Sequence, residues 1–487
     1  MSSQIYDVIV IGGGAVGENV ADRTAQGGLR TVLVESDLVG GECSYWACMP
    51  SKVLLRSGAA LAAARRVPGA AEAVTGSIDV RATLKQRDSI TSNYKDDGQA
   101  KWLESAGIGL VRGHARLTGV KEVTVTAPDG AVTVLTATHA VVVSTGSAAL
   151  LPDIDGLKEI EPWTSRDATS AQQIPERLAV IGGGVVAAEM AAAYSSLGST
   201  VTVIARSALL GKQEPFAGEL ITAALEENGV TVLVGPSTTT AHRDETGTVT
   251  LTLDNGTTVA ADQVLVAIGR TAHTQDLGLG TVGLNPGDWL MVDDSLLVQG
   301  DSPALAGDWL YATGDVNHRA LLTHQGKYQA RAAGDAIVTR AAGTPVDDAP
   351  WGAHVATADH AAVPQVTFTD PEVASVGLTA ASAVKAGYRI RILDYDLANL
   401  GGASVLAVGY VGKARAIVDL DREVLLGVTF VGQDVAELLH SATVAIVGEV
   451  PISRLWHAVP SFPTLSEVWL RLLEAYGRPG FTDEASQ

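Results

Sequence analysis

The chain has 487 residues, of which 54 are acidic and 34 are basic, so its formal net charge at pH 7 is −20. So acidic a chain is repelled by nucleic acid and by anionic membrane surfaces, and we expect neither as a partner. The length predicts about three domains, and no apolar run reaches the ~18 residues that a membrane-spanning helix requires. An apolar strand follows MSSQIYD with no secretory signal before it, which favours a cytoplasmic protein.

An internal repeat is the clearest feature of the chain. Residues 6–17 (YDVIVIGGGAVG) and 178–187 (LAVIGGGVVA) each read as an apolar strand, a glycine-rich turn and the start of a helix of small residues. A second apolar strand follows each of them, from Thr31 and from Thr200. Two βαβ units of this kind predict two doubly wound domains, each of which holds a dinucleotide.

The segments between and after the repeats have patterns of their own. Residues 51–105 are rich in Ala and amphipathic, which predicts helices, whereas residues 110–145 alternate apolar and polar, which predicts antiparallel strands. Residues 310–337 read as a strand, a turn and a helix, and 341–352 have the Gly and Pro residues of a linker. The remainder alternates strands and helices and is predicted to form a third domain, with an acidic tail at 481–487 that we expect to be mobile.

The first glycine-rich turn predicts an FAD site. Gly12, Gly14 and Gly17 let the backbone approach a pyrophosphate at a helix N-terminus, where N–H groups and the helix dipole favour anions. Glu35 ends the next strand, where its carboxylate can accept a hydrogen bond from the unphosphorylated ribose of FAD. A GxGxxG sequence alone is a weak signal, but one that follows a strand and precedes such an acid is typical of dinucleotide binding.

The second turn predicts binding of NADP. It carries the equivalent small residues Gly182, Gly184 and Ala187. Ala205 stands where an acid would end the following strand, and Arg206 and Lys212 come after it. Two cations without a carboxylate attract a 2′-phosphate, so NADPH is favoured as the reductant. The alternative is that both cations are ordinary solvated side chains.

The chain has two cysteines, Cys43 and Cys48, in the segment GGECSYWACMPSK at 40–52. A stabilising disulfide is not expected in a long cytosolic chain, and closing so small a loop would remove little entropy from the unfolded state. Two buried free thiols and a redox-active pair remain as interpretations. The position directly after the first βαβ unit, where a flavin ring would lie, favours the redox pair.

This segment resembles the pyridine nucleotide–disulfide oxidoreductases, which include dihydrolipoamide dehydrogenase, glutathione reductase and mercuric reductase. The family pattern Gly-Gly-x-Cys-x4-Cys-x-Pro-x-Lys is satisfied. Further motifs occur in the family's order: STGS at 144–147, AIGR at 267–270, ATGD at 312–315, VPQVTFTDPEVASVG at 363–377 and PTLSE at 463–467. The resemblance covers essentially the whole chain and implies an α/β fold with two Rossmann-like domains, for FAD and NADP, and a C-terminal α+β dimerisation domain.

The resemblance also implies domain boundaries and a partner. The FAD-binding domain is expected at 1–150 and 276–345, the NAD(P)-binding domain at 151–275 and the dimerisation domain at 346–487. In the family, the last domain completes the active site of the second subunit, so we expect a homodimer.

The resemblance assigns roles within the redox centre. Cys48 matches the thiol that lies against the flavin and forms a charge-transfer complex, and Cys43 matches the outer thiol that meets the substrate. Pro50 begins a helix beside Cys48, and the dipole at a helix N-terminus favours a thiolate. Lys52 and Glu189 match an ion pair beside the flavin N5; taken singly, they would be a surface charge and an acid inside a helix.

The resemblance implies further contacts to FAD. Asp315 matches the residue that hydrogen-bonds the ribityl and pyrophosphate region. The helix that begins at His324 would direct its N-terminus at the N1–O2 edge of the flavin and stabilise the reduced ring. The other cofactor-binding positions implied are Gly41, Thr145, Gly146, Gly269 and Gly314. No metal site is expected.

The chain departs from the family near its C-terminus. The family's disulfide reductases carry His-Pro-x-x-Ser-Glu, in which the His is the general acid–base for the outer thiol and the Glu orients it. Here Phe462 replaces the His, while Pro463, Ser466 and Glu467 are retained. His457 lies five residues away and is not favoured as a substitute.

Two more departures concern the acceptor. Tyr45 and Trp46, between the cysteines, either pack in the core, which is the default, or form a stacking surface for a flat acceptor. Mercuric reductases also lack the His, but they carry a C-terminal cysteine pair for metal delivery. This chain has no cysteine beyond Cys43 and Cys48, so mercury handling of that kind is disfavoured.

The leading hypothesis is an NADPH-dependent flavoprotein oxidoreductase. Electrons pass through FAD and a Cys43–Cys48 disulfide to a small-molecule acceptor, such as a quinone, that needs no acid at position 462. The alternatives are a reductase of a low-molecular-weight or protein disulfide, and a redox-sensing flavoprotein whose disulfide state controls a partner.

Overall fold

The computed structural model describes residues 2–478 and divides into two compact units. The first unit consists of Met1–Pro50, Lys85–Leu150 and Gly269–Asp359, and the second of Ser51–Leu84, Leu151–Ile268 and His360–Gln487. Each unit holds one of the two glycine-rich turns. The tail at 481–487, which we expected to be mobile, lies outside the described residues.

A seven-stranded sheet forms the centre of the first unit. Its strands are β1 (Ser2–Ile11), β2 (Thr31–Glu35), β3 (Gly109–Arg112), β4 (His114–Gly119), β5 (Glu122–Thr126), β6 (Val132–Val143) and β16 (Leu310–Ala312). The order is β3-β2-β1-β6-β5-β4, with β16 also paired to β6. The pairs β4–β5 and β5–β6 are antiparallel, which confirms the antiparallel strands predicted within 110–145, whereas β3 pairs in parallel with β2. β1, β2, β6 and β16 are also parallel, so their carboxyl ends meet at one edge.

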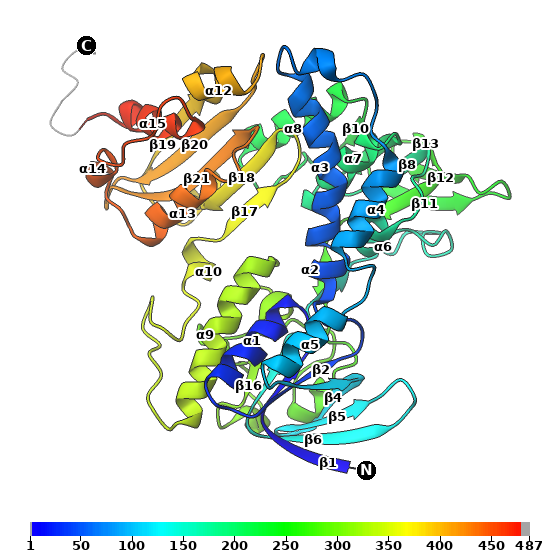
Figure 1. The fold of residues 1–487 in the computed structure, drawn as a ribbon, viewed down its shortest axis with the longest axis vertical. Helices are drawn as coiled ribbons and strands as arrows, with labels where there is room; N and C mark the ends of the chain where they lie inside the picture. Colours follow the sequence, from blue (N-terminus) through cyan, green and yellow to red (C-terminus); the bar gives the residue numbers. More distant parts are fainter. Residues whose placement is uncertain (1, 479–487) are drawn as a thin grey trace. The chain divides into compact units, whose positions relative to one another are not determined.

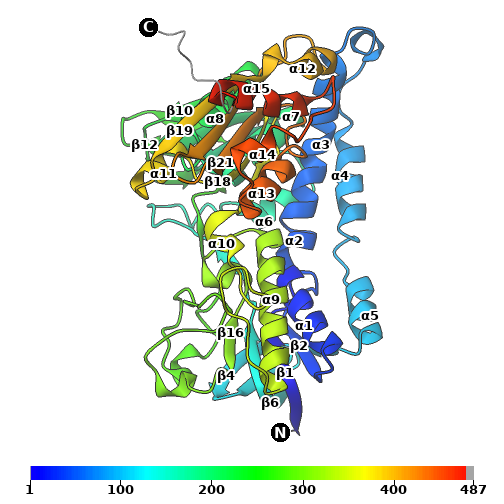
Figure 2. The same cartoon turned by 90° about the vertical axis from the view of Figure 1, so that its left-hand side faces the viewer.

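Two long helices, α1 (Ala15–Gln26) and α9 (Thr323–Ala341), cover one face of this sheet and lie side by side (Figures 1 and 2). Val8 and Val10 of β1 pack in the core under these helices, while Ile9 and Ile11 face the opposite core, as the period of two in a strand requires. Gly334 permits the close helix contact, because a Cβ there would lie 2.7 Å from the Cβ of Arg23. Both helices follow carboxyl ends of parallel strands, so both N-termini lie at the edge where dinucleotides bind.

Helices fill the region between the repeat units, as predicted for 51–105. They are α2 (Gly41–Tyr45), α3 (Cys48–Arg65), α4 (Val80–Ile90) and α5 (Asp97–Ser105). Both views show α3 beside α4, and the hydroxyls of Ser57 and Thr83 form a hydrogen bond of 3.1 Å between them. The first unit also holds a two-stranded sheet of β7 (Ser147–Ala149) and β15 (Arg270–Ala272) and short 3-10 helices at Leu279–Val282, Pro303–Leu305 and Gly314–Asn317.

The second unit contains the second repeat. A parallel sheet runs in the order β10-β9-β8-β14, formed by β8 (Arg177–Ile181), β9 (Thr200–Ala205), β10 (Thr231–Val234) and β14 (Gln263–Val266). The associated helices are α6 (Ser165–Ser170), α7 (Val185–Ser196) and α8 (Pro215–Glu227). An antiparallel sheet of β11 (Thr238–Arg243), β12 (Val249–Leu253) and β13 (Thr258–Ala261) covers the other face, so the parallel sheet is buried on both sides.

The C-terminal part of the second unit is an antiparallel sheet with helices. The sheet runs in the order β17-β18-β21-β20-β19, from β17 (Pro364–Thr367), β18 (Glu372–Gly377), β19 (Ile390–Asp396), β20 (Lys413–Asp419) and β21 (Val424–Gly432). The helices are α10 (Ala358–Ala361), which spans the boundary between the units, α11 (Ala380–Lys385), α12 (Gly401–Leu406), α13 (Leu439–Val447), α14 (Ile452–Leu455) and α15 (Val468–Tyr476), with 3-10 turns at Leu397–Asn399 and Leu465–Glu467. Buried Glu214 joins this part to α8, because it accepts the Ala380 N–H and pairs with Arg415 at 2.8 Å.

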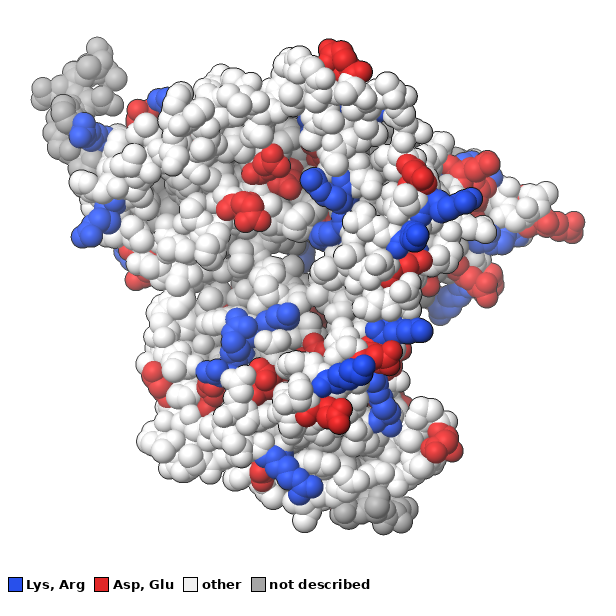
Figure 3. Space-filling model, in the orientation of Figure 1, with Lys and Arg blue, Asp and Glu red and all other residues white. Residues whose placement is uncertain are grey.

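The predicted fold class is confirmed: a mixed and a parallel Rossmann-like sheet and a C-terminal α+β part are present. Residues 342–357 contain no helix or strand, in agreement with a linker at 341–352. Among the described residues, no helix is both long enough and apolar enough to cross a bilayer. Acidic and basic side chains are mixed over the face drawn in Figure 3. The four domain boundaries given above stay predictions.

Candidate active site

The first glycine-rich turn joins β1 to α1 and needs its glycines for steric reasons. Gly12 has a φ of +100°, and a Cβ there would lie 2.4 Å from the carbonyl oxygen of Ser144. A Cβ on Gly17 would lie 1.9 Å from the carbonyl oxygen of Gly12. Gly14 is the N-cap of α1 and contributes no side-chain hydrogen bond to the helix. The turn is therefore tight, and the backbone N–H groups at the start of α1 are left for a ligand.

Glu35 closes this turn from the end of β2. Its Oε2 accepts a hydrogen bond from the Gly13 N–H at 2.6 Å, and its Oε1 accepts one from the Asp37 N–H at 2.7 Å. Burial raises the pKa of Glu35, and both N–H donors oppose that shift because they stabilise the charged form. The carboxylate thus lies against the turn, where we predict that it meets the ribose of FAD.

Unpartnered polar atoms around the turn fit a bound FAD. The Thr145 hydroxyl and Glu18 Oε1 are buried, and neither has a hydrogen-bond partner within the part of the chain that the structure describes. Buried polar atoms normally find a partner, and the phosphates and hydroxyls of FAD supply such groups. A Cβ on Gly14 would meet nothing closer than 3.9 Å, so the cradle is open at that point. Gly146, next to Thr145, has a φ of +73°.

Asp315 follows β16 and is held by a network that sequence analysis missed. Ser147 donates a hydrogen bond to Asp315 Oδ2 at 2.5 Å, and Arg270 Nε lies 3.7 Å from the same oxygen. Arg270 also donates to the Ser147 carbonyl at 2.6 Å and to Glu42 Oε2 at 3.1 Å. Gly269 precedes it with a φ of +148°. Arg270 belongs to the AIGR motif and Glu42 precedes Cys43, so their motif positions were visible, but their pairing was not.

The cysteine segment begins directly against the first turn. The Gly40 N–H donates to the Gly13 carbonyl at 2.7 Å. Gly41 has a φ of +59°, and a Cβ there would lie 2.7 Å from the Cα of Gly14. Only glycine tolerates both conditions. The backbone therefore places α2, which carries Cys43, beside the predicted pyrophosphate site.

The two cysteines form a half-buried pair of reduced thiols. Cys43 is hydrogen-bonded to Cys48, and Cys48 Sγ lies 3.3 Å from the hydroxyl of Thr323, the first residue of α9. The pKa of Cys43 is raised, first by its hydrogen bond to Cys48, then by burial, then by the charge of Cys48. A negative charge on Cys48 therefore disfavours a second thiolate at Cys43. The sequence pointed to His324, which is exposed, whereas the contact to Cys48 comes from its half-buried neighbour Thr323.

The predicted partners Lys52 and Glu189 meet in the second unit. Lys52 Nζ donates to Glu189 Oε2 at 2.8 Å, and the Glu189 side chain is almost fully buried. The Phe368 N–H donates to Glu189 Oε1 at 3.0 Å, and Lys52 Nζ lies 4.8 Å from the centre of the Phe368 ring. Phe368, which sequence analysis did not single out, thus holds both members of the pair. Their role at the flavin stays a prediction.

The second glycine-rich turn repeats the geometry of the first. Gly182 has a φ of +132°, and a Cβ there would lie 2.2 Å from the carbonyl oxygen of Ala267. Gly184 is the N-cap of α7, and a Cβ there would meet nothing within 4 Å. Ala187, Arg206 and Lys212 complete the predicted site. Ala187 is buried where α7 packs, whereas Arg206 and Lys212 are exposed after the end of β9, where they are accessible to a phosphate group.

In the C-terminal motif, Glu467 pairs with an arginine four residues later. Arg471 donates to Glu467 Oε1 at 2.5 Å, while Glu467 Oε2 is buried and has no hydrogen bond among the described residues. A Cβ on Gly401 would lie 3.0 Å from the Phe462 ring and 3.7 Å from Glu467 Oε2, so these two groups border the same glycine. Phe462 is 76% exposed. The chain thus keeps the carboxylate beside position 462 but no proton donor there.

The aromatic residues between the cysteines belong to the core. Tyr45 is 1% exposed and Trp46 is 9% exposed. The Tyr45 hydroxyl donates to the Val39 carbonyl at 3.0 Å, and Trp46 stacks on Tyr94 with ring centroids 6.4 Å apart. The core interpretation is confirmed, and a stacking surface for a flat acceptor at these two residues is not supported.

Two family descriptions match the chain. Residues 6–334 match "Pyridine nucleotide-disulphide oxidoreductase", and residues 363–472 match "Pyridine nucleotide-disulphide oxidoreductase, dimerisation domain". The chain is 32% identical over 473 residues to a mercuric reductase of Acidithiobacillus ferrooxidans, covering 96% of this chain and 81% of the relative. It is 31% identical over 472 residues to a dihydrolipoyl dehydrogenase of Chlorobaculum tepidum, covering 95% of each.

Solved structures share the fold. The HOCl-induced flavoprotein disulfide reductase RclA from Escherichia coli, in a Cu(II) complex, matches with a TM-score of 0.81 and 21% identity, over 97% of this chain and 99% of that one. LpdA from Mycobacterium tuberculosis matches with a TM-score of 0.79 and 23% identity, over 97% and 99% of the two chains.

Glu18 makes stability depend on pH. Burial raises its pKa to about 7, from 4.5 in the unfolded chain, against the opposing effect of Lys327. The stability from this shift is complete below pH 4.5 and is lost as pH rises through 7, a change of about 3 kcal/mol. Glu18→Gln should therefore unfold a few degrees above the parent at pH 8, with most of that advantage absent at pH 5. Thermal unfolding of the FAD-free protein at both pH values measures this, since no cofactor contact to Glu18 then contributes.

Glu104→Gln is the control, because Glu104 is an exposed carboxylate on α5. It should change the melting temperature little, and equally at both pH values. The pKa assigned to Glu18 is wrong if Glu18→Gln shifts the melting temperature by the same amount at pH 5 and pH 8.

Proposed function

Because the chain belongs to the pyridine nucleotide-disulphide oxidoreductase family, we propose that it is an NADPH-dependent flavoprotein reductase. Its redox-active residues are Cys43 and Cys48, and its final acceptor is a small molecule that needs no protein acid, such as a quinone. The observation that carries this proposal is the pairing of Cys43 with Cys48 beside the first dinucleotide turn, in a chain whose acid position is Phe462.

The first unit supplies the groups that would hold FAD. Bound FAD supplies a two-electron carrier between a nicotinamide nucleotide and the thiols. The N–H groups at the start of α1 would bind its pyrophosphate, Glu35 would accept a hydrogen bond from a ribose hydroxyl, and Asp315 would accept one from a hydroxyl of the ribityl region. Thr145 and the N-terminus of α9 complete the contacts, the latter by stabilising negative charge on the reduced ring.

The cysteines store the second electron pair. Two electrons and two protons convert the Cys43–Cys48 disulfide to two thiols. Thr323 can donate a hydrogen bond to the Cys48 thiolate, and the N-terminus of α3 favours its charge. Cys43 retains its proton until the pair gives its electrons away, because its raised pKa disfavours a second thiolate.

Phe462 has no acidic proton, and this favours an acceptor that does not release a thiolate. A disulfide attacked by Cys43 releases a thiolate that must be protonated, and Phe462 cannot supply the proton. A quinone releases no leaving group, and the two electrons and two protons that form the hydroquinone would be supplied as the Cys43 and Cys48 thiols re-form their disulfide. Mercuric ion, which the names of several relatives indicate as their substrate, is less favoured because no second cysteine pair exists. Within residues 2–478, no group of three or more His, Cys, Asp or Glu side chains is placed to hold a metal ion.

Reduction of a small disulfide is the second candidate. The dithiol itself favours it, and dihydrolipoyl dehydrogenases are among the relatives. The buried Glu467 Oε2, which has no hydrogen bond among the described residues, is an acceptor that could orient a proton donor brought by the substrate. Solvent would otherwise have to supply the proton, at a cost in rate.

We further propose a homodimer. The dimerisation-domain match at 363–472 supports it. This part of the chain exposes large apolar side chains, which is typical of an interaction surface. They include Val405, Val408, Val411, Val459 and Phe462, each more than half exposed.

The first test of the proposal concerns the nucleotide. NADPH should reduce the flavin more efficiently than NADH, because Arg206 and Lys212 attract the 2′-phosphate. A charge-assisted contact is worth ~1.5–3 kcal/mol, so Arg206→Ala should lower the efficiency with NADPH roughly tenfold to a hundredfold and leave that with NADH nearly unchanged. Stopped-flow reduction with each nucleotide measures both. Equal efficiency of NADPH and NADH in the parent protein would refute the assignment.

The second test concerns the thiols. Anaerobic titration should consume four electrons per flavin, two on FAD and two on the cysteines. The two-electron form should show long-wavelength absorbance from the Cys48 thiolate beside the flavin. Cys48→Ser should abolish this band, whereas Cys43→Ser should retain it because Cys48 then stays a thiolate. Uptake of only two electrons would mean that the cysteines are not a redox pair.

The third test concerns Phe462 and the acceptor. Turnover of glutathione disulfide and lipoamide should be poor, while reduction of the enzyme by NADPH and turnover of quinones should be fast. Phe462→His should raise disulfide turnover at least tenfold, because the imidazole would lie near Glu467 Oε2 and a positioned acid contributes ~10²–10⁴-fold. Steady-state rates with several disulfides and quinones provide the measurement.

Phe462→Leu is the matched control, since it shortens the side chain without adding a proton donor, and it should leave disulfide turnover low. Adding Glu467→Gln to Phe462→His should remove most of the gain. Fast disulfide reduction by the unmodified protein would overturn the preference for an acceptor that needs no acid.

A further inference from the structure

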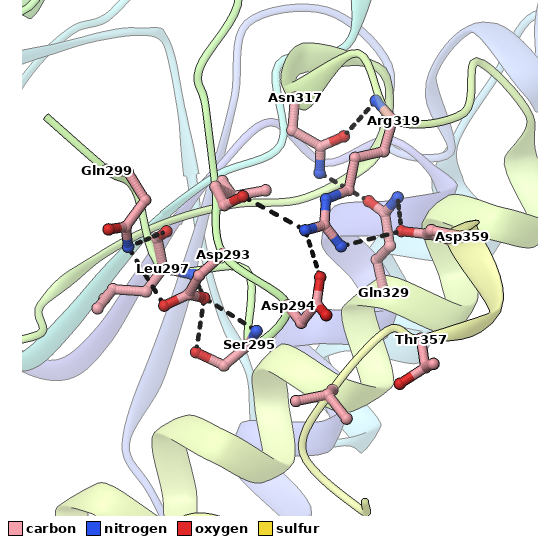
Figure 4. Close-up of polar contacts among 12 residues, drawn as sticks. Asp293, Asp294, Ser295, Leu297, Gln299, Asn317, Arg319, Gln329, Thr357 and Asp359 are labelled. Atoms are coloured by element: carbon pink, nitrogen blue, oxygen red, sulfur yellow. Dashed lines mark hydrogen bonds and ion pairs between the residues drawn. The ribbon is translucent and has the colours of Figure 1, made fainter. Parts of the chain in front are cut away.

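A buried carboxylate lies at the end of the first unit, outside the predicted cofactor contacts. Asp359, the last residue of that unit, lies in α10, and its side chain is 1% exposed. Its Oδ1 accepts a hydrogen bond from Gln325 Nε2 at 2.8 Å. Its Oδ2 accepts one from Gln329 Nε2 at 2.8 Å, and Arg319 Nη1 lies 3.7 Å from the same oxygen (Figure 4). So deep a carboxylate is tolerated only because it is hydrogen-bonded.

Gln329 connects Asp359 to the loop of Asp315. Gln329 is fully buried, and its Oε1 accepts from the Gly314 N–H at 2.8 Å and from Asn317 Nδ2 at 2.8 Å. Gly314 has a φ of +78° and immediately precedes Asp315. The backbone of the loop is therefore held at its left-handed residue by one amide, and that amide is held by Asp359.

Gln325 connects Asp359 to the start of α9. It is the third residue of the helix, two positions after Thr323, whose hydroxyl contacts Cys48. The next residue, Gly326, approaches the loop so closely that a Cβ there would lie 3.1 Å from the Cα of Gly314. One carboxylate thus holds both segments that we predict to contact FAD.

The charge of Asp359 determines which way the amides point. A carboxylate only accepts hydrogen bonds, so Gln325 and Gln329 must both direct their NH₂ groups at it. Gln329 Oε1 is then left facing two donors, Gly314 N–H and Asn317 Nδ2. An amide in place of this carboxylate would direct its own NH₂ at one glutamine. If the Gln329 amide rotated by about 180° so that its oxygen accepted a hydrogen bond from this NH₂, the NH₂ of Gln329 would face the Gly314 N–H. Two donors facing each other repel.

We propose that Asp359 is a positioning residue for FAD. Through Gln329 and Gln325 it fixes the Gly314–Asp315 loop and the first turn of α9. In this way it sets the affinity for FAD and the reduction potential of the bound flavin, although it does not touch the cofactor. This inference rests on the proposed function only in placing FAD against these two segments. It does not depend on the final acceptor.

Two variants of the network test the proposal. Asp359→Asn removes the charge at nearly constant volume and should weaken FAD binding at least tenfold, equivalent to about 1.4 kcal/mol. The double variant Asp359→Asn with Gln329→Glu should restore binding to within about threefold of the parent. In that variant the introduced amide accepts from Gln325 and donates to one oxygen of the introduced carboxylate, whose other oxygen accepts from Gly314 and Asn317. Rescue of this kind depends on hydrogen-bond direction rather than on packing.

Asp293→Asn is the matched control. Asp293 lies in the neighbouring loop and accepts from the Ser295 N–H at 2.9 Å, the Leu297 N–H at 3.1 Å and Gln299 Nε2 at 3.2 Å, with no hydrogen bond to Gly314 or α9 (Figure 4). It carries the same chemical change in a similarly hydrogen-bonded carboxylate. It should leave the FAD affinity within about twofold of that of the parent and the reduction potential nearly unchanged.

The measurement is titration of each apoprotein with FAD by flavin fluorescence, followed by dye-coupled potentiometry of the holoprotein. Neither assay uses a nucleotide or an acceptor, so a parent that binds FAD normally but reduces no quinone defeats the proposed function and not this inference. The inference is overturned if Asp359→Asn binds FAD as tightly as the parent or the Asp293→Asn control, or if the double variant fails to recover binding. Where Asp359→Asn alone cannot be isolated, recovery of a folded, FAD-binding double variant supports the inference and its absence refutes it.

Discussion

The contact between Gly14 and Gly41 is the constraint on which the candidate site depends. The two backbone segments approach so closely that a Cβ on Gly41 would collide with the Cα of Gly14, and the Gly40 N–H fixes the approach through the Gly13 carbonyl. Because α2 starts at Gly41, this contact places the first cysteine next to the turn that opens α1. A larger residue at Gly41 would separate the redox segment from the dinucleotide turn.

Around this contact, three carboxylates of the first unit are held by short hydrogen bonds, and the arginines beside two of them lie farther away, at 3.7 Å from Asp315 and from Asp359. Glu35 accepts two backbone N–H groups, Asp315 accepts the hydroxyl of Ser147, and Asp359 accepts two amides. Hydrogen bonds of this kind have direction, so each acid orients its neighbours as well as stabilising itself. Such an arrangement suits a site for FAD, whose phosphates would be repelled by loosely held carboxylates and whose hydroxyls need fixed acceptors.

The sequence predicted the fold class and most of the strands around the site, because the βαβ repeats depend on local patterns: an apolar strand, a glycine turn and a helix of small residues. It also predicted Lys52 with Glu189 from the family motif. It did not predict Arg270 with Glu42, since ion pairs between distant segments have no local signature. Asp359 was missed for the same reason, as a single acid after a linker looks like any solvated charge. The placement of Trp46 in the core could be stated only as one of two alternatives, because burial depends on the partner Tyr94.

In the C-terminal motif, the backbone around position 462 is tightly packed, although Phe462 has none of the acid–base chemistry of the family's His. The segment is held in place, because a Cβ on Gly402 would lie 2.3 Å from the carbonyl carbon of Thr464. Glu467 remains buried, but Arg471 now neutralises it, so the acid is stable without an imidazole beside it. Its retention is therefore no sign of acid–base catalysis. In the proposed homodimer, the exposed ring of Phe462 would lie beside the outer thiol of the second subunit and remove water from that face. A dry, apolar wall disfavours release of a charged thiolate and accommodates a neutral, flat molecule, so under the proposed function the same substitution would weaken disulfide chemistry and would suit a quinone.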